Sequence, residues 1–408
     1  MIGLASIEVA LAALRGGRPV LVTDSEDREN EGDVILAAQT LSTEWLAWTI
    51  RHTSGYLCAP VTDEMADRLG LPLMVADNRD PLRTAYTVSI DAAQGVTTGI
   101  SAADRARTIG LLADPSSTTD SFVRPGHVIP LRAKAGGVLE RPGHTEAAVD
   151  LCRLAGLTPA GAIGELVNDD GTMMRLPEVL ATGAVNDIPV ITIEQLIAWR
   201  QLHDRVETLA ETTLPTRHGE FSAVGFRDRL TGDEHVALVS PRGAQGPNPL
   251  VRLHSECLTG DAFGSLRCDC GPQLERSLDR IAAEGGVLVY LRGHEGRGVG
   301  LVSKLQAYAL QDTGFDTVDA QLELDLPVDG REYAAGAAIL SALGLHTVRL
   351  LTNNPAKVEA MRRYGIEVAA VEGLSIAPNA ANRAYLRTKR DRMGHDLVVD
   401  ASDQDATA

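Results

Sequence analysis

Apolar and polar positions follow two different periods in the first half of the chain. Short runs rich in β-branched and aliphatic residues predict strands at 17–24, 84–91 and 127–133. Apolar residues spaced three and four apart predict helices at 43–52, 101–114 and 145–156. The first half is therefore expected to mix helices and strands.

The second half shows the same mixture after a change of pattern. A helical pattern over 192–207 is followed by a polar stretch at 208–220, and a hairpin is predicted over 221–240. Later segments predict strands at 251–256, 286–293 and 347–354, and helices at 272–284 and 355–365. We place a boundary near residue 206, which gives mixed α/β (α+β) domains at 1–205 and 206–408. From about Asn379 the rising charge density predicts a poorly ordered tail.

Composition limits the class of protein and its partners. The chain has 408 residues, 44% hydrophobic and 23% charged, which is typical of globular protein too long for a single core. It contains no apolar segment of membrane-spanning length and its first residues do not resemble a signal peptide, so we expect a cytoplasmic protein with no membrane partner. A net charge of −17 and only 4% aromatic residues argue against a nucleic-acid partner.

The segment SEDRENEGD, after the first predicted strand, is unusually acidic. Its five carboxylates surround Arg28 and belong to Glu26, Asp27, Glu29, Glu31 and Asp33. Carboxylates crowded in this way repel one another unless cations lie among them, and hard oxygen ligands suit Mg²⁺. A solvated acidic turn is the alternative for such a run considered alone.

Two Arg-Pro-Gly-His units occur further along, at 124–127 and 141–144. Thr145 follows the second unit at a position typical of a helix cap. Arg141, Thr145 and the start of the helix could therefore hold a phosphate group. His144 considered alone would more often be structural than a metal ligand.

These motifs resemble the 3,4-dihydroxy-2-butanone 4-phosphate synthase family over nearly all of residues 5–200. The resemblance is carried by DRENEGD, RHTSGYLCAP, TAYTVSIDA, GVTTGISAADRA and RPGHTEAAVDL. It implies conversion of ribulose 5-phosphate to the four-carbon product and formate, with two Mg²⁺ (or Mn²⁺) ions on Glu29 and His144. It also implies that His127 and Glu165 are catalytic. The implied substrate contacts are Arg28, Glu29, Asp33, Arg141, Pro142, Gly143, His144, Thr145 and Glu165.

A cysteine cluster marks the second half. Cys257, Cys268 and Cys270 are separated by ten residues and by one residue. Three thiolates with an open fourth position form the pattern of a catalytic zinc site, in which a bound water ionises near neutral pH. The alternative is a structural zinc completed by a histidine, with the candidates His254, His294 and His346.

Two turns of the second half suit a polyphosphate. RGHEGRGVGL places Arg292 and Arg297 among four glycines, and TNNPAKVEA places Lys357 in the first turn of a predicted helix capped by Asn354. A glycine-rich turn considered alone is more often structural.

Together the second-half motifs resemble GTP cyclohydrolase II over about residues 207–375. They are RLHSECLTGDAFGSLRCDCGPQLE, RGHEGRGVGL, YALQDTGFDTVDA, VDGREY and RLLTNNPAK. The resemblance implies one Zn²⁺ on the three cysteines, Mg²⁺ with GTP, and ring opening that releases formate and diphosphate. It implies Asp329 as proton acceptor and Arg331 as nucleophile toward the α-phosphorus. The implied GTP contacts are Arg252, Leu253, His254, Ser255, Glu256, Gln273, Glu295, Gly296, Arg297, Thr317, Thr352 and Lys357.

Both products would enter one later step, the condensation that leads to riboflavin, and the resemblance implies a homodimer. One alternative is that only one half is catalytic and the other half is a dimerisation scaffold. Another is a zinc-bearing nucleic-acid binding module, which the negative charge disfavours.

Overall fold

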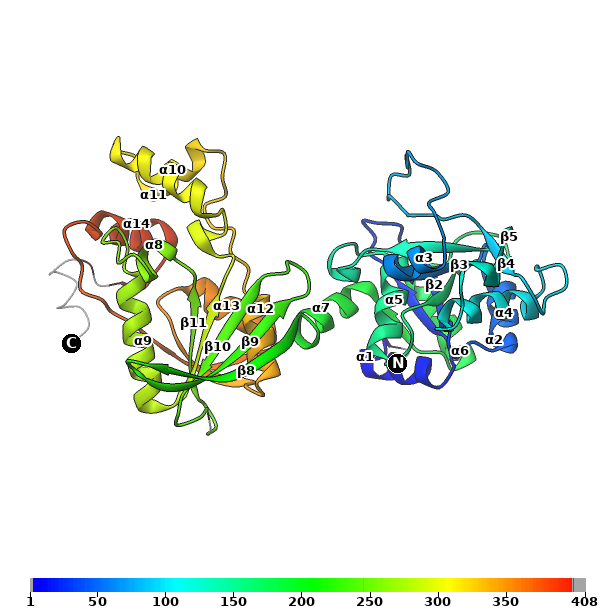
Figure 1. Ribbon diagram of the computed structural model, residues 1–408, viewed down its shortest axis with the longest axis horizontal. Helices are drawn as coiled ribbons and strands as arrows, with labels where there is room; N and C mark the ends of the chain where they lie inside the picture. The colour runs from blue at the N-terminus through cyan, green and yellow to red at the C-terminus, as the bar shows by residue number, and fades with distance from the viewer. Residues whose placement is uncertain (1–2, 245, 398, 400–408) are drawn as a thin grey trace. The chain divides into compact units, whose positions relative to one another are not determined.

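The computed structural model describes residues 3–244, 246–397 and 399 and divides into two units, Met1–Trp199 and Arg200–Ala408 (Figure 1). The division falls within helix α7, Ile193–His203. The domain limit near residue 206 stays a prediction. Each unit contains one seven-stranded sheet covered by helices, and the predicted class of mixed α/β domains in tandem is confirmed.

The first unit is built on a sheet with the strand order β4-β5-β3-β6-β2-β1-β7. Its strands are β1 (Val20–Thr23), β2 (Gly32–Ala37), β3 (Cys58–Thr62), β4 (Ile90–Ala92), β5 (Phe122–Ala133), β6 (Gly161–Glu165) and β7 (Val190–Thr192). Its helices are α1 (Ile7–Arg15), α2 (Thr43–His52), α3 (Asp63–Arg68), α4 (Ala102–Ala113), α5 (His144–Leu154) and α6 (Leu176–Asn186), with short 3-10 turns η1 (Thr119–Ser121) and η2 (Gly137–Leu139).

Both faces of the first sheet are buried, which explains its uninterrupted apolar strands. In β1, Leu21 packs into one core, whereas its neighbours Val20 and Val22 pack into the other. Helices α2 and α4 contribute to the first core, and α1 and α5 contribute to the second. Strands buried on both faces read as continuous hydrophobic runs, as this one does.

The second unit has the strand order β14-β13-β11-β12-β10-β9-β8. Its strands are β8 (Val206–Thr216), β9 (Gly219–Asp228), β10 (Glu234–Val239), β11 (Leu250–Ser255), β12 (Gly286–Leu291), β13 (Thr347–Leu351) and β14 (Glu367–Glu372). Its helices are α8 (Leu258–Asp261), α9 (Cys270–Glu284), α10 (Leu301–Asp312), α11 (Thr317–Glu323), α12 (Ala334–Ala342), α13 (Pro355–Arg363) and α14 (Arg383–Met393), with the 3-10 turn η3 (Glu295–Arg297).

Side chains of β11 alternate between the two faces of the second sheet, and this places two polar residues on the same face. Val251 and Leu253 point into the core that α12 and α13 cover. Leu250 points to the opposite face, where α9 packs. Side chains two apart in a strand share a face, so Arg252 and His254 also lie on the α9 side. Both are buried although they are polar.

Three expectations about local structure are wrong. The polar stretch at 208–220 forms strand β8 and the start of β9, paired antiparallel. The strand expected at 84–91 shortens to β4, preceded by isolated bridges at Tyr86 and Thr87. The tail from Asn379 contains helix α14, which buries Leu386. Residues 400–408 of that tail lie outside the described residues.

Ion pairs attach helix α14 of the charged tail to the rest of the second unit. The Nζ atom of Lys389 lies 3.0 Å from a carboxylate oxygen of Asp269, and Arg392 pairs with Asp316 and Asp319. The positive charges of α14 thus meet acidic residues of their own unit. In the described part of the chain, each helix is too short or too polar to cross a bilayer.

Candidate active sites

An acidic and imidazole cluster lies where β1, β2 and α5 meet. Asp24, Glu29 and His144 offer ligand atoms that all lie within 4.8 Å of one another. The Nδ1 atom of His144 lies 3.6 Å from Glu29 and 3.7 Å from Asp33. Its Nε2 atom lies 3.2 Å from the backbone oxygen of Val22, which orients the ring.

The electrostatics of this cluster favour a cation. Burial raises the pKa of Asp33 to about 7, and its Oδ1 atom is buried without a hydrogen-bond partner. A hydrogen bond with His144 lowers the pKa of Glu29 to about 2, assisted by the charge of Arg28 and opposed by burial. Burial disfavours a charged His144, but the nearby carboxylates raise its pKa to about 9. Carboxylate and imidazole ligands in this arrangement fit Mg²⁺ or Mn²⁺.

Asp24 is a member of the cluster that we did not predict. Its carboxylate accepts the backbone N–H groups of Glu29 (3.0 Å) and Glu31 (2.8 Å). It also accepts a hydrogen bond from the Arg28 guanidinium at 2.9 Å. Asp24 therefore shapes the acidic loop. Its place directly after a strand, before the acidic run, was the available sequence signal.

Two arginines converge on the start of α5. The helix begins at His144 with Gly143 as its cap, so Thr145 is its second residue and not the cap that we expected. A Cβ atom on Gly143 would lie 2.5 Å from Arg141 Nη1 and 2.9 Å from Arg28 Nη2. A side chain at this position would displace both guanidinium groups. Two guanidinium groups beside helix N–H groups are suited to bind a phosphate.

The two predicted catalytic residues of this unit lie apart from each other. Asp33 and Glu165 are paired on adjacent strands, whereas β3 lies between Glu165 and His127. With about 4.8 Å between strands, strand β5, which carries His127, is about 10 Å from β6, which ends at Glu165, and about 14 Å from β2, which carries Asp33. His127 instead faces Asp91 at 2.7 Å, and Glu165 accepts a hydrogen bond from Ser54 at 2.7 Å. Asp91 and Ser54 were not predicted from the sequence.

The three cysteines of the second unit are brought together as predicted. Their sulfur atoms lie within 4.8 Å of one another, with 3.7 Å between Cys257 and Cys268. Cys270 is the first residue of α9. A Cβ atom on Gly260 would lie 2.8 Å from the Cys268 sulfur, so this glycine gives the thiols their space.

The donor set fits zinc with an open position. Among the residues that the structure describes, this metal-ligand group contains cysteine alone. Of the three histidines considered as a fourth ligand, His254 lies 3.1 Å from the Asp261 carboxylate, His294 lies 3.1 Å from Ser255, and His346 is exposed. The geometry therefore supports the catalytic pattern over the closed structural one.

Lys304 of α10, which was not predicted from the sequence, joins the thiol cluster. Its Nζ atom lies 3.1 Å from the Cys257 sulfur and 2.6 Å from Glu295. The second oxygen of Glu295 accepts the backbone N–H of Leu258 at 2.6 Å. Hydrogen bonds from Cys268 and Cys270 and the charge of Lys304 lower the pKa of Cys257, which favours one thiolate in the cluster. Hydrogen bonds with Cys257, together with burial, raise the pKa of Cys268 and of Cys270. Those two thiols therefore need a cation beside them to lose their protons.

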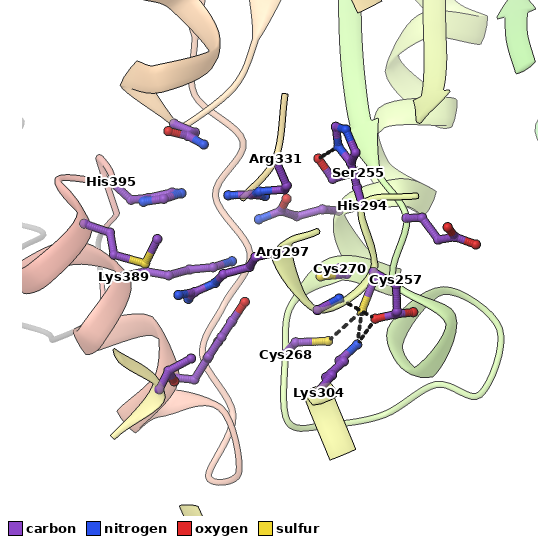
Figure 2. A pocket seen from close by; sticks show the side chains of 18 of the residues that line it. Ser255, Cys257, Cys268, Cys270, His294, Arg297, Lys304, Arg331, Lys389 and His395 are labelled. Atoms are coloured by element: carbon purple, nitrogen blue, oxygen red, sulfur yellow. Dashed lines mark hydrogen bonds and ion pairs between the residues drawn. The ribbon is translucent and has the colours of Figure 1, made fainter. Parts of the chain in front are cut away.

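A pocket opens beside the thiols and collects most of the predicted GTP contacts (Figure 2). The predicted residues that line it are Arg252, His254, Ser255, Glu256, Gln273, Glu295, Gly296, Arg297, Thr317, Arg331, Thr352 and Lys357. Leu253 is turned into the core, where its backbone oxygen accepts a hydrogen bond from Lys357 at 2.7 Å. The lining residues that we did not predict include Lys304, Tyr308, Gln311, Gln321, Tyr385, Lys389, Met393 and His395.

The pocket gathers basic side chains with which an anion could pair. Burial, with the nearby charges of Arg252 and Arg331, lowers the pKa of Lys357 well below its usual value, so its positive charge is disfavoured until an anion lies beside it. The Nε atom of Arg252 and the Nη2 atom of Arg297 are buried without hydrogen-bond partners. Such unpaired donors are costly unless a ligand satisfies them. A polyphosphate would do so.

Asp329 and Arg331 form an ion pair beside the pocket. Arg331 Nε donates to Asp329 Oδ1 at 2.8 Å, and Nη2 pairs with Oδ2. Burial opposes a charged Arg331, but Asp329 raises the pKa of Arg331 above its usual value. The expected proximity is present, although the ion pair favours a protonated arginine.

Comparisons with known proteins divide the chain in the same way. A family model described as 3,4-dihydroxy-2-butanone 4-phosphate synthase matches residues 8–199, and one described as GTP cyclohydrolase II matches residues 207–372. The riboflavin biosynthesis protein RibBA of Salinispora arenicola is 58% identical over 397 residues, covering 97% of this chain and 94% of that protein. RibBA of Mycobacterium tuberculosis is 55% identical over 406 residues, covering 98% and 96%.

A solved structure is similar along most of the chain. It is RibBX, a two-domain 3,4-dihydroxy-2-butanone 4-phosphate synthase from A. baumannii, with 32% identity and a TM-score of 0.56. The similarity covers 91% of this chain and 100% of that one.

Proposed function

Since this chain belongs to the RibBA family of riboflavin biosynthesis proteins, in which a 3,4-dihydroxy-2-butanone 4-phosphate synthase domain precedes a GTP cyclohydrolase II domain, we propose that its two ligand clusters serve two independent reactions. The chain is a bifunctional enzyme, a lyase and a hydrolase. The observation that carries the assignment of sites is one metal-ligand group in each unit, the first of carboxylates and imidazole and the second of thiols.

In the first unit the substrate is ribulose 5-phosphate, and the products are 3,4-dihydroxy-2-butanone 4-phosphate and formate. Arg28, Arg141 and the start of α5 bind the phosphate. Glu29 and His144 would hold two Mg²⁺ or Mn²⁺ ions, and these ions would supply positive charge beside the sugar oxygens. Asp33, whose pKa burial raises to about 7, is suited to exchange a proton with the substrate near neutral pH. Glu165 lies beside it on the next strand.

In the second unit the substrate is GTP, and the products are the diaminopyrimidinone ribosylamino phosphate, formate and diphosphate. Cys257, Cys268 and Cys270 would hold Zn²⁺, and the metal would supply the Lewis acidity that lowers the pKa of water for opening of the imidazole ring. Arg252, Arg297 and the start of α13 face the triphosphate, and Mg²⁺ accompanies it. Gln273 and the neighbouring polar residues orient the base.

Arg331 and Asp329 act at the α-phosphorus. We propose Arg331 as the nucleophile and Asp329 as the acceptor of its proton, supported by their direct contact. Because the ion pair favours protonated Arg331, stabilisation of charge on the α-phosphate is a second role for the same guanidinium, and it requires no proton transfer.

Separate formate assays test the two reactions. We expect the purified protein to release formate from ribulose 5-phosphate with Mg²⁺, and from GTP with Zn²⁺ and Mg²⁺. Formate from only one substrate would favour the alternative that the other half is a scaffold, although both halves match enzyme families. Binding of GTP without release of formate would favour the alternative of a nucleic-acid binding module. The net charge of −17 argues against that alternative.

We also propose a homodimer. Strand β5, which carries His127, is about 14 Å from β2, which carries Asp33, so a second copy is the simplest way to bring an essential imidazole to the cluster. In the second unit, Phe263, Leu266 and Val302 are exposed on the zinc loop and on α10, a composition typical of an interface. Light scattering should give twice the chain mass of 43.3 kDa. A monomer that is active in both assays would contradict this proposal.

The location proposed is the cytoplasm. All five cysteines are free thiols. A reducing compartment would keep the three thiols of the proposed zinc site available for the metal.

A further inference from the structure

Helix α14 and the residues after it form one wall of the GTP pocket. The family match ends at residue 372, yet Tyr385, Lys389, Met393 and His395 line the same pocket as the cysteines. Figure 2 shows Lys389 and His395 reaching into the pocket from this segment. The tail is therefore part of the site and contributes groups to it.

Lys389 makes the most specific of these contacts. Its Nζ atom lies 3.0 Å from Asp269 Oδ1 and 4.6 Å from the centre of the Tyr385 ring. Asp269 is 2% exposed and stands between the zinc ligands Cys268 and Cys270. A buried carboxylate is costly unless it is paired, and Lys389 supplies the opposite charge.

The contact continues into the substrate site. The other oxygen of Asp269 accepts a hydrogen bond from Gln273 Nε2 at 2.5 Å. The amide oxygen of Gln273 accepts one from Arg252 Nη2 at 2.7 Å. Arg252 donates through Nη1 to the backbone oxygen of Leu351 at 2.9 Å. One chain of hydrogen bonds thus runs from α14 to two proposed GTP contacts.

We propose that Lys389 is a positioning residue of the GTP site, which orients Asp269 and, through it, the amide of Gln273 and the guanidinium of Arg252. This inference rests on the proposed function of the second unit. It assigns a role to a segment outside the matched family region. Lys389 acts through Asp269, so its effect falls on binding of GTP before chemistry begins.

Other contacts hold α14 in place when Lys389 is changed. Arg392 pairs with Asp316 at 2.5 Å and with Asp319 at 2.8 Å. The backbone N–H of Asp396 donates to the oxygen of Asn353 at 3.1 Å. A substitution at Lys389 therefore tests the polar chain and leaves these anchors intact.

The test is Lys389→Met, which keeps the length of the side chain and removes its charge. We expect KM for GTP to rise about tenfold or more with kcat within about threefold, because an interaction that orients bound substrate is lost. Zinc should stay at one per chain, and formate from ribulose 5-phosphate should be unchanged. Thr388→Ala is the control and should match the wild type, because the Thr388 hydroxyl donates within the helix, to the backbone oxygen of Ala384.

Each other outcome contradicts the inference. An unchanged KM would remove the positioning role, and loss of zinc would show that Lys389 maintains the metal loop instead. A lower kcat at constant KM would show that Lys389 acts in the transition state or on the folded fraction, and not on binding of GTP. If Lys389→Met does not fold, Asp269→Asn must show the same rise in KM, and a normal KM there overturns the proposal. Wild-type protein without formate from GTP would instead refute the proposed function itself.

Discussion

We expect Cys268→Ser to abolish formate release from GTP while formate release from ribulose 5-phosphate continues at the wild-type rate. The Cys268 sulfur lies 3.7 Å from that of Cys257, and a serine hydroxyl stays protonated and is a poor zinc ligand. Loss of about 4 kcal/mol of transition-state stabilisation would slow the reaction about 1,000-fold. The bound zinc should fall well below one per chain.

The control for this substitution is Ser265→Ala in the same loop, which should retain zinc and both activities. If Cys268→Ser also stopped the first reaction, the two sites would not be independent. If it kept both zinc and GTP turnover, the assignment of the thiol cluster as the zinc site would be wrong.

The reciprocal experiment is Glu29→Ala, which should abolish formate release from ribulose 5-phosphate and spare the reaction with GTP. Glu29 faces His144 across 3.6 Å, and its removal takes away a carboxylate that we assign to the divalent cations. A loss of about 1,000-fold follows if the ions supply about 4 kcal/mol to the transition state. Added Mg²⁺ or Mn²⁺ should restore little activity, because the ligand itself is missing.

Glu26→Ala is the matched control for Glu29→Ala. Glu26 belongs to the same acidic loop but is exposed and lies outside the ligand group. Its substitution should leave the rate and the Mg²⁺ dependence unchanged. Equal losses in both variants would mean that the loop acts through its total charge, and that Glu29 is no specific ligand.

The elements that could be predicted are those with a buried face. Strand β11 alternates between two environments, and β1 reads as apolar because both of its faces are buried. Strand β8 was missed because it is an edge strand with mostly exposed side chains, so its pairing leaves no hydrophobic period. Helix α14 was missed because long-range ion pairs such as Lys389 with Asp269 stabilise it, and a local pattern does not contain them.

The same limit applies to the functional sites, where only residues in recognisable motifs could be predicted. Motifs led to the cysteines and to Glu29 and His144, which the structure brings together in two groups. Asp24 and Lys304 were not identified, because the first acts through backbone hydrogen bonds and the second reaches Cys257 from a distant helix. Spacing along the chain gives no indication of such contacts. It also does not indicate that strand β3 separates His127 from Glu165.

We propose that the reaction with GTP depends on a zinc ion held by three thiolates with a fourth position open for water. X-ray absorption at the zinc edge of the purified, active protein tests it directly. We predict three sulfur neighbours at about 2.3 Å and one oxygen neighbour at about 2.0 Å. Four protein ligands around the zinc, in a protein that does not turn over GTP, would contradict the account.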